Sequence, residues 1–209
     1  MKTKWKEVLA GRIENIDQAL NKLKMPATQH LASIYAKLLV EAGGIPSKAL
    51  FRPEDMNKYL AQITLYEVPK IGSPIYKLVG QQAREAFASN PLGRKYTDLV
   101  PKERAESASA SFRRCCFTPC AMLVYVDHVR RSGKADRHEV IGVPFHSDNE
   151  DHGFLLFMDA VTETKLISPG TIDDTFTHIV LSRNFIDLGY GTPEDHFDLI
   201  PDDTEISSQ

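Results

Sequence analysis

The chain lacks long apolar segments and has too few cysteines for a disulfide framework. No stretch of its 209 residues approaches the ~20 consecutive apolar residues that a membrane-spanning helix needs. The basic N-terminus is not followed by an apolar run of signal-peptide length. The three cysteines are Cys115, Cys116 and Cys120, an odd and crowded set that argues against a secreted disulfide-bonded protein. We therefore expect a cytoplasmic protein without a membrane span.

An excess of positive charge is also missing. The chain has 25 lysines and arginines against 28 aspartates and glutamates, a formal net charge of −3. Nucleic-acid-binding domains use basic surfaces to neutralise phosphates, so we expect no nucleic-acid partner. The composition is otherwise that of an ordinary globular protein, with 42% hydrophobic residues. A domain of this length buries about 70% of its unfolded surface, which removes the need for a stabilising metal ion.

Helical patterns dominate the first part of the chain. Apolar residues at spacings of three and four predict an amphipathic helix over Trp5 to Leu23. A second helix is predicted over Thr28 to Ala42, with Thr28 as its N-cap and Gly43-Gly44 as its stop. Pro53 at a first helical position predicts a short helix to about Leu60. The two N-terminal helices are expected to form a lid over the sheet or a dimer surface.

Five strands with short connections follow, and they predict an α+β fold with an antiparallel sheet. Helices are predicted between the second and third strands, over Gln81 to Ala88 and Lys102 to Phe117. The segment Thr175 to Leu188 has a strand-like composition but is not counted in this five-stranded core. The five strands are Ile63 to Val68, Ile75 to Val79, Ala121 to Arg130, His138 to His146 and Gly153 to Val161.

Short motifs in the first half of the chain resemble one known family. The motifs are Gly44-Ile45-Pro46-Ser47-Lys48, Phe51-Arg52-Pro53 and Tyr76-Lys77-Leu78-Val79-Gly80, followed by Gly93. Together with the element order, they resemble the bacterial PAS family common in alphaproteobacteria, over about Leu38 to Val161. Lys48 and Lys77 stand where that family often has arginine, so any two-pronged arginine contact is lost here. The resemblance implies a sensory or protein-docking role in signalling, without naming a ligand.

This resemblance divides the chain into three parts. Residues 1–43 are expected to be a helical extension, 44–165 a PAS-like domain and 166–209 a C-terminal segment with an acidic tail. Gly80 lies where the second strand must turn sharply into a helix, and we expect glycine there for its freedom to adopt positive φ.

The resemblance also implies a pocket between the sheet and the inserted helices. An axial histidine for haem is missing from Lys102 to Phe117, and no flavin-type cysteine motif is found. We therefore expect no cofactor, and any ligand is expected to be a small apolar molecule. The candidate lining residues, which also fit an ordinary core, are Phe87, Phe112, Cys116, Tyr125, Phe145 and Phe157.

Other groupings of reactive residues favour structural roles. The three cysteines lack the second pair that a zinc site needs, and they fit a buried helix end, with a redox thiol as the alternative. His146 and His152 lie in an acidic loop that fits a solvated hairpin better than a metal site. His128 and His138 are expected to face each other across adjacent strands as a polar pair rather than as metal ligands.

The expected function is therefore a non-enzymatic one. No Ser-His-Asp arrangement with a nucleophile elbow, P-loop or Gly-x-Gly-x-x-Gly motif is found, and no catalytic residue or metal ligand is assigned. We expect a sensory or adaptor module that acts by binding a ligand, a signalling protein or both. No chain remains for an effector domain, so a partner must carry the output, and the Trp5 to Leu23 helix is the expected dimer contact. The alternative is a small-molecule carrier or enzyme of α+β fold with a pocket in the same place.

Overall fold

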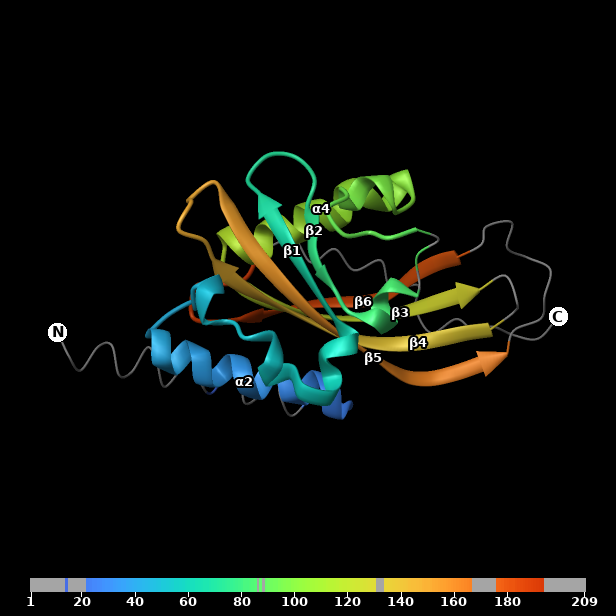
Figure 1. Ribbon diagram of the computed structural model, residues 1–209, viewed down its shortest axis with the longest axis horizontal. Helices are drawn as coiled ribbons and strands as arrows, with labels where there is room; N and C mark the ends of the chain where they lie inside the picture. Colours follow the sequence, from blue (N-terminus) through green and yellow to red (C-terminus); the bar gives the residue numbers. More distant parts are fainter. Residues whose placement is uncertain are drawn as a thin grey trace.

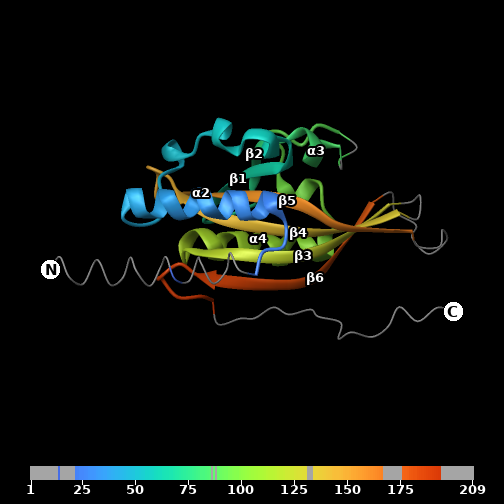
Figure 2. The same ribbon diagram turned by 90° about the horizontal axis from the view of Figure 1, so that it is seen from below.

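The computed structural model describes residues 14, 22–85, 87, 89–130, 134–166 and 176–193. Within these residues, six strands form one antiparallel sheet with helices on both faces (Figures 1 and 2). The order across the sheet is β2-β1-β5-β4-β3-β6. The α+β class is thus confirmed, whereas the count of five strands is wrong. The strands are β1 (Ile63–Pro69), β2 (Ile75–Val79), β3 (Cys120–Arg130), β4 (Lys134–His146), β5 (His152–Leu166) and β6 (Phe176–Asp187).

The additional strand is β6, at one edge of the sheet. It pairs antiparallel with β3 along its whole length, from Arg130 opposite Phe176 to Cys120 opposite Asp187. The composition of Thr175 to Leu188 predicts a strand, but β6 does not pair with β5, the strand that precedes it in the chain. Local sequence carries no signal for a partner three strands earlier in the chain, which is why the sequence fails to add β6 to the sheet.

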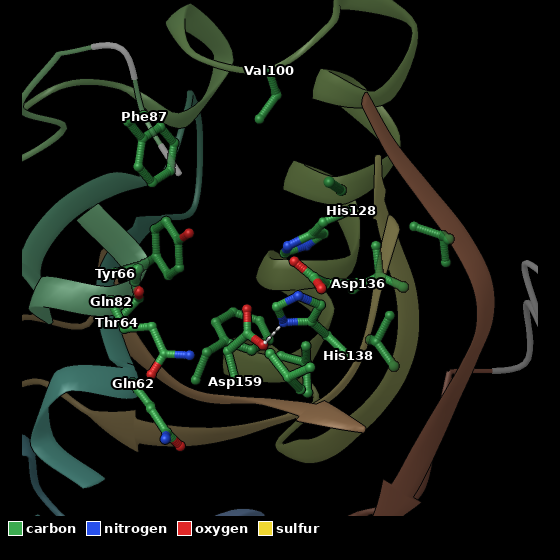
Figure 3. A pocket seen from close by; sticks show the side chains of 18 of the residues that line it. Gln62, Thr64, Tyr66, Gln82, Phe87, Val100, His128, Asp136, His138 and Asp159 are labelled. Carbon is green, nitrogen blue, oxygen red and sulfur yellow. Dashed lines mark hydrogen bonds and ion pairs between the residues drawn. The ribbon is translucent and has the colours of Figure 1, made fainter. Parts of the chain in front are cut away.

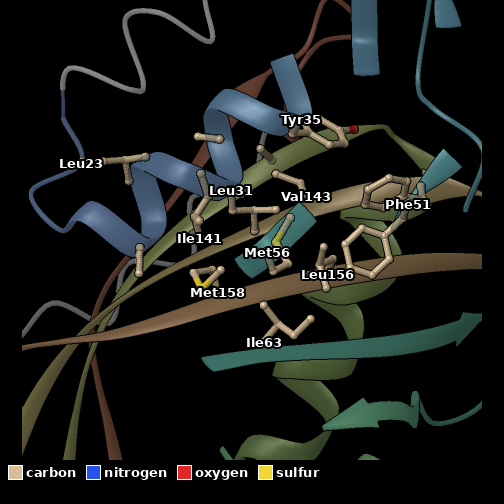
Figure 4. Packing of buried hydrophobic residues seen from close by; sticks show 14 of the residues in the cluster. Leu23, Leu31, Tyr35, Phe51, Met56, Ile63, Ile141, Val143, Leu156 and Met158 are labelled. Atoms are coloured by element: carbon tan, nitrogen blue, oxygen red, sulfur yellow. The ribbon is translucent and has the colours of Figure 1, made fainter. Parts of the chain in front are cut away.

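Helix α2 (Pro26–Ala42) covers one face of the sheet, against β4 and β5. Its buried stripe of Leu31, Tyr35 and Leu39 packs on apolar side chains of the sheet. Figure 4 shows Leu31 and Tyr35 in this cluster. The helix ends as predicted, with Gly43 in the left-handed region at φ 64°. Its beginning differs from the prediction, because Met25 is the N-cap residue and Pro26 occupies the first turn.

A buried glutamate on β4 holds the start of α2 in place. Glu139 is fully buried, and its carboxylate accepts hydrogen bonds from the backbone N–H groups of Lys24 (2.9 Å) and Met25 (3.0 Å). The hydroxyls of Thr28 and Tyr125 donate to the same carboxylate. Burial and the bond to Glu139 raise the pKa of Tyr125 to about 12. Thr28 therefore binds a side chain of the sheet rather than capping the helix.

The opposite face of the sheet is covered by the helices inserted between β2 and β3. These are α3 (Gln81–Arg84), the 3₁₀ turn η3 (Tyr96–Asp98) and α4 (Lys102–Phe117). The bounds of α4 are those predicted, while α3 is shorter than predicted. Before the sheet lie two further 3₁₀ segments, η1 (Lys48–Leu50) and η2 (Pro53–Gln62). Pro53 does open η2, but the segment is 3₁₀ rather than α-helical and is interrupted at Asn57, where φ is 50°.

Gly80 adopts an ordinary backbone conformation, contrary to the prediction. Its φ is −62°, which any residue can adopt. The glycine is required instead by a close approach of two chain segments. A Cβ atom at this position would lie 2.4 Å from the carbonyl oxygen of Ala61.

Most of the predicted helix Trp5 to Leu23 lies outside the described residues. Of its residues the structure describes Glu14, Lys22 and Leu23, and Leu23 is buried in the cluster beneath α2. The acidic end of the chain, residues 194–209, also lies outside the described part. No helix among the described residues is long and apolar enough to cross a membrane.

Candidate ligand pocket

A cavity of about 660 Å³ lies between the sheet and the helices α3, η3 and α4 (Figure 3). Its floor is formed by residues of β1, β3, β4 and β5, and Val180 and Arg183 of β6 add to one side. Its roof comes from residues such as Gln82, Phe87, Val100 and Ala108. The cavity therefore occupies the face of the sheet opposite to α2, between the sheet and the inserted helices.

One part of the cavity wall is aromatic. Tyr66 of β1 lies at the centre, with ring centroids 4.7 Å from Tyr76 and 5.0 Å from Phe112. Phe112 is in turn 5.0 Å from Phe157. Interlocked rings of this kind present a large, stiff apolar surface to a ligand.

Buried tyrosines should make the fold sensitive to high pH. Burial raises the pKa of Tyr35, Tyr66, Tyr76 and Tyr96 above the ordinary value of about 10. The folded state therefore keeps these protons longer than the unfolded state, and the stability they contribute is present below about pH 10 and lost as the pH rises through the folded values. We expect tyrosinate absorbance to rise together with loss of the circular dichroism signal. The expectation would be contradicted if all tyrosines ionised near pH 10 while the circular dichroism signal remained that of the folded protein.

Three of the six predicted lining residues line the cavity and three do not. Phe87, Phe112 and Phe157 line the cavity. Tyr125 lies on the α2 face, bound to Glu139, and Phe145 also lies there, 5.4 Å from the ring of Tyr35. Successive strand residues point to opposite faces, so Tyr125 and Phe145 belong to the other core.

The remaining predicted lining residue, Cys116, lies at the side of the aromatic cluster. Its thiol donates to the carbonyl of Phe154 (3.6 Å), and its side chain fills the space beside Gly153. Cys115 and Cys120 are buried free thiols 4.0 Å apart. Burial raises the pKa of Cys115 and Cys116, the opposite of the shift that a reactive redox thiol needs.

The other part of the cavity wall is polar and comes from three adjacent strands. His128 of β3 and His138 of β4 are buried, with ring centroids 3.9 Å apart. Nδ1 of His138 lies 2.5 Å from Oδ1 of Asp159 on β5. Asp136, opposite His128 in the β3–β4 ladder, accepts a hydrogen bond from the hydroxyl of Thr164 (2.6 Å). Figure 3 shows His128, Asp136, His138 and Asp159 grouped on one side of the cavity.

An irregularity in the sheet helps to form this polar group. Between Arg137 and His138 the pairing of β4 with β5 shifts by one residue, so that Thr162 has no direct partner. Bulges of this kind increase the local twist and redirect side chains. Past the bulge, His138 stands opposite Val161, which makes Asp159 its diagonal neighbour on the same face.

Several buried polar atoms of the lining have no hydrogen-bond partner. In the part of the chain that the structure describes there are four such side-chain atoms, and three belong to residues that line the cavity. These are Oε1 of Gln62, Nε2 of His138 and Nε of Arg183. Arg183 also donates from Nη1 to Ser111 (2.8 Å), and burial lowers its pKa. A buried polar atom without a partner is costly, so the lining is complementary to a ligand that carries polar groups.

Two further histidines considered as ligands lie apart from this group. His146 is exposed and His152 is half-buried, and Nδ1 of His152 lies 3.0 Å from Glu67. His128 and His138 do face each other as predicted, but the sequence does not single out Asp159, Asp136 or Arg183. The available signal was the alternation of β5, which places Asp159 on the same face as Leu155 and Phe157. A charged residue in line with core residues indicates a polar site inside the domain.

No family model matches the chain, and no curated protein matches it. The resemblance to the PAS family therefore rests on the quoted motifs and the element order.

Proposed function

We propose that this chain is a cytoplasmic PAS-type sensory module that binds a small molecule in the cavity and acts through a signalling protein partner. The observation that carries the proposal is the lining of the cavity. The lining combines an interlocked aromatic wall with three buried polar atoms that have no partner. The volume of about 660 Å³ lies in the range of small-molecule sites, about 300–1,000 Å³.

The lining favours a ligand that is apolar over most of its surface and polar at one end. The sequence predicts an apolar ligand, because it reveals the aromatic residues and not the buried polar ones. His138, Asp159 and Arg183 offer hydrogen-bonding groups of both signs of charge to such a ligand. An aromatic or aliphatic body with a carboxylate, hydroxyl or amine group is the chemistry that fits this wall.

The element order supports the PAS part of the proposal. The helices α3, η3 and α4 lie between β2 and β3, where the resemblance implies inserted helices. Several motif residues have clear structural roles in that layout. Tyr76 and Val79 are buried on β2, and the hydroxyl of Ser47 accepts a hydrogen bond from the N–H of Ala49 at the start of η1. Lys77 stands at a position where the family often has arginine, and it forms an ion pair with Glu67 (2.7 Å).

A bulky substitution in the cavity should abolish ligand binding. Val124 is buried on the cavity face of β3, so Val124→Trp places an indole in the space of the ligand. We expect the unmodified chain to bind anilinonaphthalene sulfonate, an aromatic anion, at one site per chain. The Val124→Trp variant should bind it at least about tenfold more weakly, a loss of about 1.4 kcal/mol. Fluorescence titration measures both affinities.

The matched control is Val40→Trp, at an exposed position of α2 on the other face of the sheet. It makes the same chemical change without entering the cavity, so its dye affinity should equal that of the unmodified chain. Circular dichroism melts establish that both variants fold. Equal dye binding by all three folded chains would contradict the proposal. Native mass spectra of the same samples report any retained molecule. They also show whether the chain forms a homodimer, for which the predicted contact is the segment Trp5 to Leu23.

The contact between His138 and Asp159 also supports the alternative of a carrier or an enzyme. A histidine bound to a carboxylate inside a pocket is an arrangement that can transfer protons to and from a substrate. The fate of a retained ligand distinguishes sensing or carriage from catalysis. Release of the same molecule after prolonged incubation favours sensing or carriage. A change in its mass that Asp159→Asn abolishes favours catalysis.

A further inference from the structure

We infer that His128, His138 and Asp159 form a binding site for a divalent transition-metal ion in the polar wall of the cavity. The three residues are supplied by β3, β4 and β5, three adjacent strands of the sheet. Their donor atoms, one from each side chain, all lie within 4.8 Å of one another. Among the described residues this is the one group of three His, Cys, Asp or Glu side chains with such spacing.

The spacing is compatible with a single bound ion. Nitrogen and oxygen ligands lie about 2.0–2.2 Å from zinc and similar ions, so two ligands of one tetrahedral ion are separated by about 3.4 Å. Donor atoms within 4.8 Å of one another reach that geometry by side-chain movements of about 1 Å. Rotations about the side-chain bonds of His128 and Asp159 supply movements of this size.

His138 provides a second, independent indication of a ligand. Its side chain is buried, its Nδ1 atom is paired with Asp159, and its Nε2 atom has no hydrogen-bond partner. Nε2 is therefore the nitrogen of His138 that an ion can occupy without displacing a partner. Because Nδ1 and Nε2 point to opposite sides of the ring, Asp159 binds the same ion only after its carboxylate has left Nδ1.

The donor set selects the class of ion. Two imidazoles and one carboxylate favour zinc, iron(II), cobalt(II) and related ions over magnesium and calcium, which prefer oxygen ligands. Three protein ligands leave coordination positions open, and these positions face the cavity. An ion held here would therefore be accessible to a small molecule in the cavity, as in sites of two histidines and one carboxylate.

Metal binding is tested on the full chain with Co²⁺ and Zn²⁺ as probes. After treatment with a chelator, the protein should bind one Co²⁺ per chain, with an absorption spectrum of nitrogen and oxygen ligation. Zn²⁺ should displace it. His128→Gln and His138→Gln should each weaken binding on the order of 100-fold, as measured by equilibrium dialysis. Asp159→Asn, which preserves shape, should also weaken it.

The matched control is His146→Gln, which removes an exposed histidine outside the cavity and should leave the affinity unchanged. The inference is overturned if the unmodified chain binds no Co²⁺, or if His128→Gln and His138→Gln bind it as tightly as the control. A thiolate-to-cobalt charge-transfer band would also overturn it, because it would assign the ion to the cysteines. Melting curves identify any variant that fails to fold. If the histidine variants do not fold, the Co²⁺ affinity of Asp159→Asn decides the test. Dye binding in the cavity is measured separately, so this inference and the proposed function can fail independently.

Discussion

Replacing Glu139 with glutamine should destabilise the fold by about 3 kcal/mol, a large fraction of the stability of a typical domain. The carboxylate accepts hydrogen bonds from two backbone N–H groups and two hydroxyls. A glutamine side chain keeps the shape but has one acceptor oxygen, and its NH₂ group would point at donors. Hydrogen bonds to a buried charged group contribute about 1.5–3 kcal/mol each, and three of the four donors lie at the start of α2.

Urea unfolding followed by circular dichroism measures the loss. Glu41→Gln is the control, because Glu41 is exposed near the end of the same helix and its replacement should change stability by less than about 0.5 kcal/mol. Equal midpoints for the two variants would show that the carboxylate of Glu139 does not hold α2 on the sheet. A rise in hydrogen exchange confined to α2 in Glu139→Gln would locate the effect.

Gly80→Ala should destabilise the protein by more than about 3 kcal/mol, because the new methyl group overlaps with backbone rather than with a side chain. The added Cβ would lie 2.4 Å from the oxygen and 2.5 Å from the carbon of the Ala61 carbonyl. Relief would require η2 to move away from α3. That movement would also break the hydrogen bond from the N–H of Gly80 to the carbonyl of Ile63 (2.8 Å).

Gly43→Ala provides the comparison. Gly43 has a positive φ of 64°, yet a Cβ atom there would meet nothing within 4 Å. Its replacement should cost only the backbone strain of about 1–2 kcal/mol. The positive-φ glycine is thus expected to be the more tolerant of the two in thermal melts. If Gly43→Ala proved as damaging as Gly80→Ala, close contact would not be the reason for the glycine at position 80.

Helices and strands were predictable where they depend on the sequence pattern of their own residues. The bounds of α4 and β2 follow from periodicity and from the flanking glycines and prolines, and the stop of α2 follows from Gly43. The role of Gly80 was not predictable, because the contact with Ala61 depends on how η2 packs against α3. The same holds for the start of α2, where the carboxylate that binds the helix comes from a residue 115 positions away from Lys24.

The candidate site was predictable in its aromatic part and not in its polar part. Phe112 and Phe157 are recognisable as pocket or core from their apolar context. The polar wall depends on the pairing of β3 with β4 and on the bulge at His138, which brings Asp159 to its diagonal position. No local pattern encodes the register of three strands, so a carboxylate and two imidazoles that look separate in the sequence meet in the fold.

Strand β4 carries His138 and Glu139 in succession, one in the cavity wall and the other beneath α2. A single peptide unit of β4 therefore connects the cavity wall on one face of the sheet with the α2 contact on the other face. A displacement of this part of β4 would therefore alter the cavity wall and the contact at the start of α2 together.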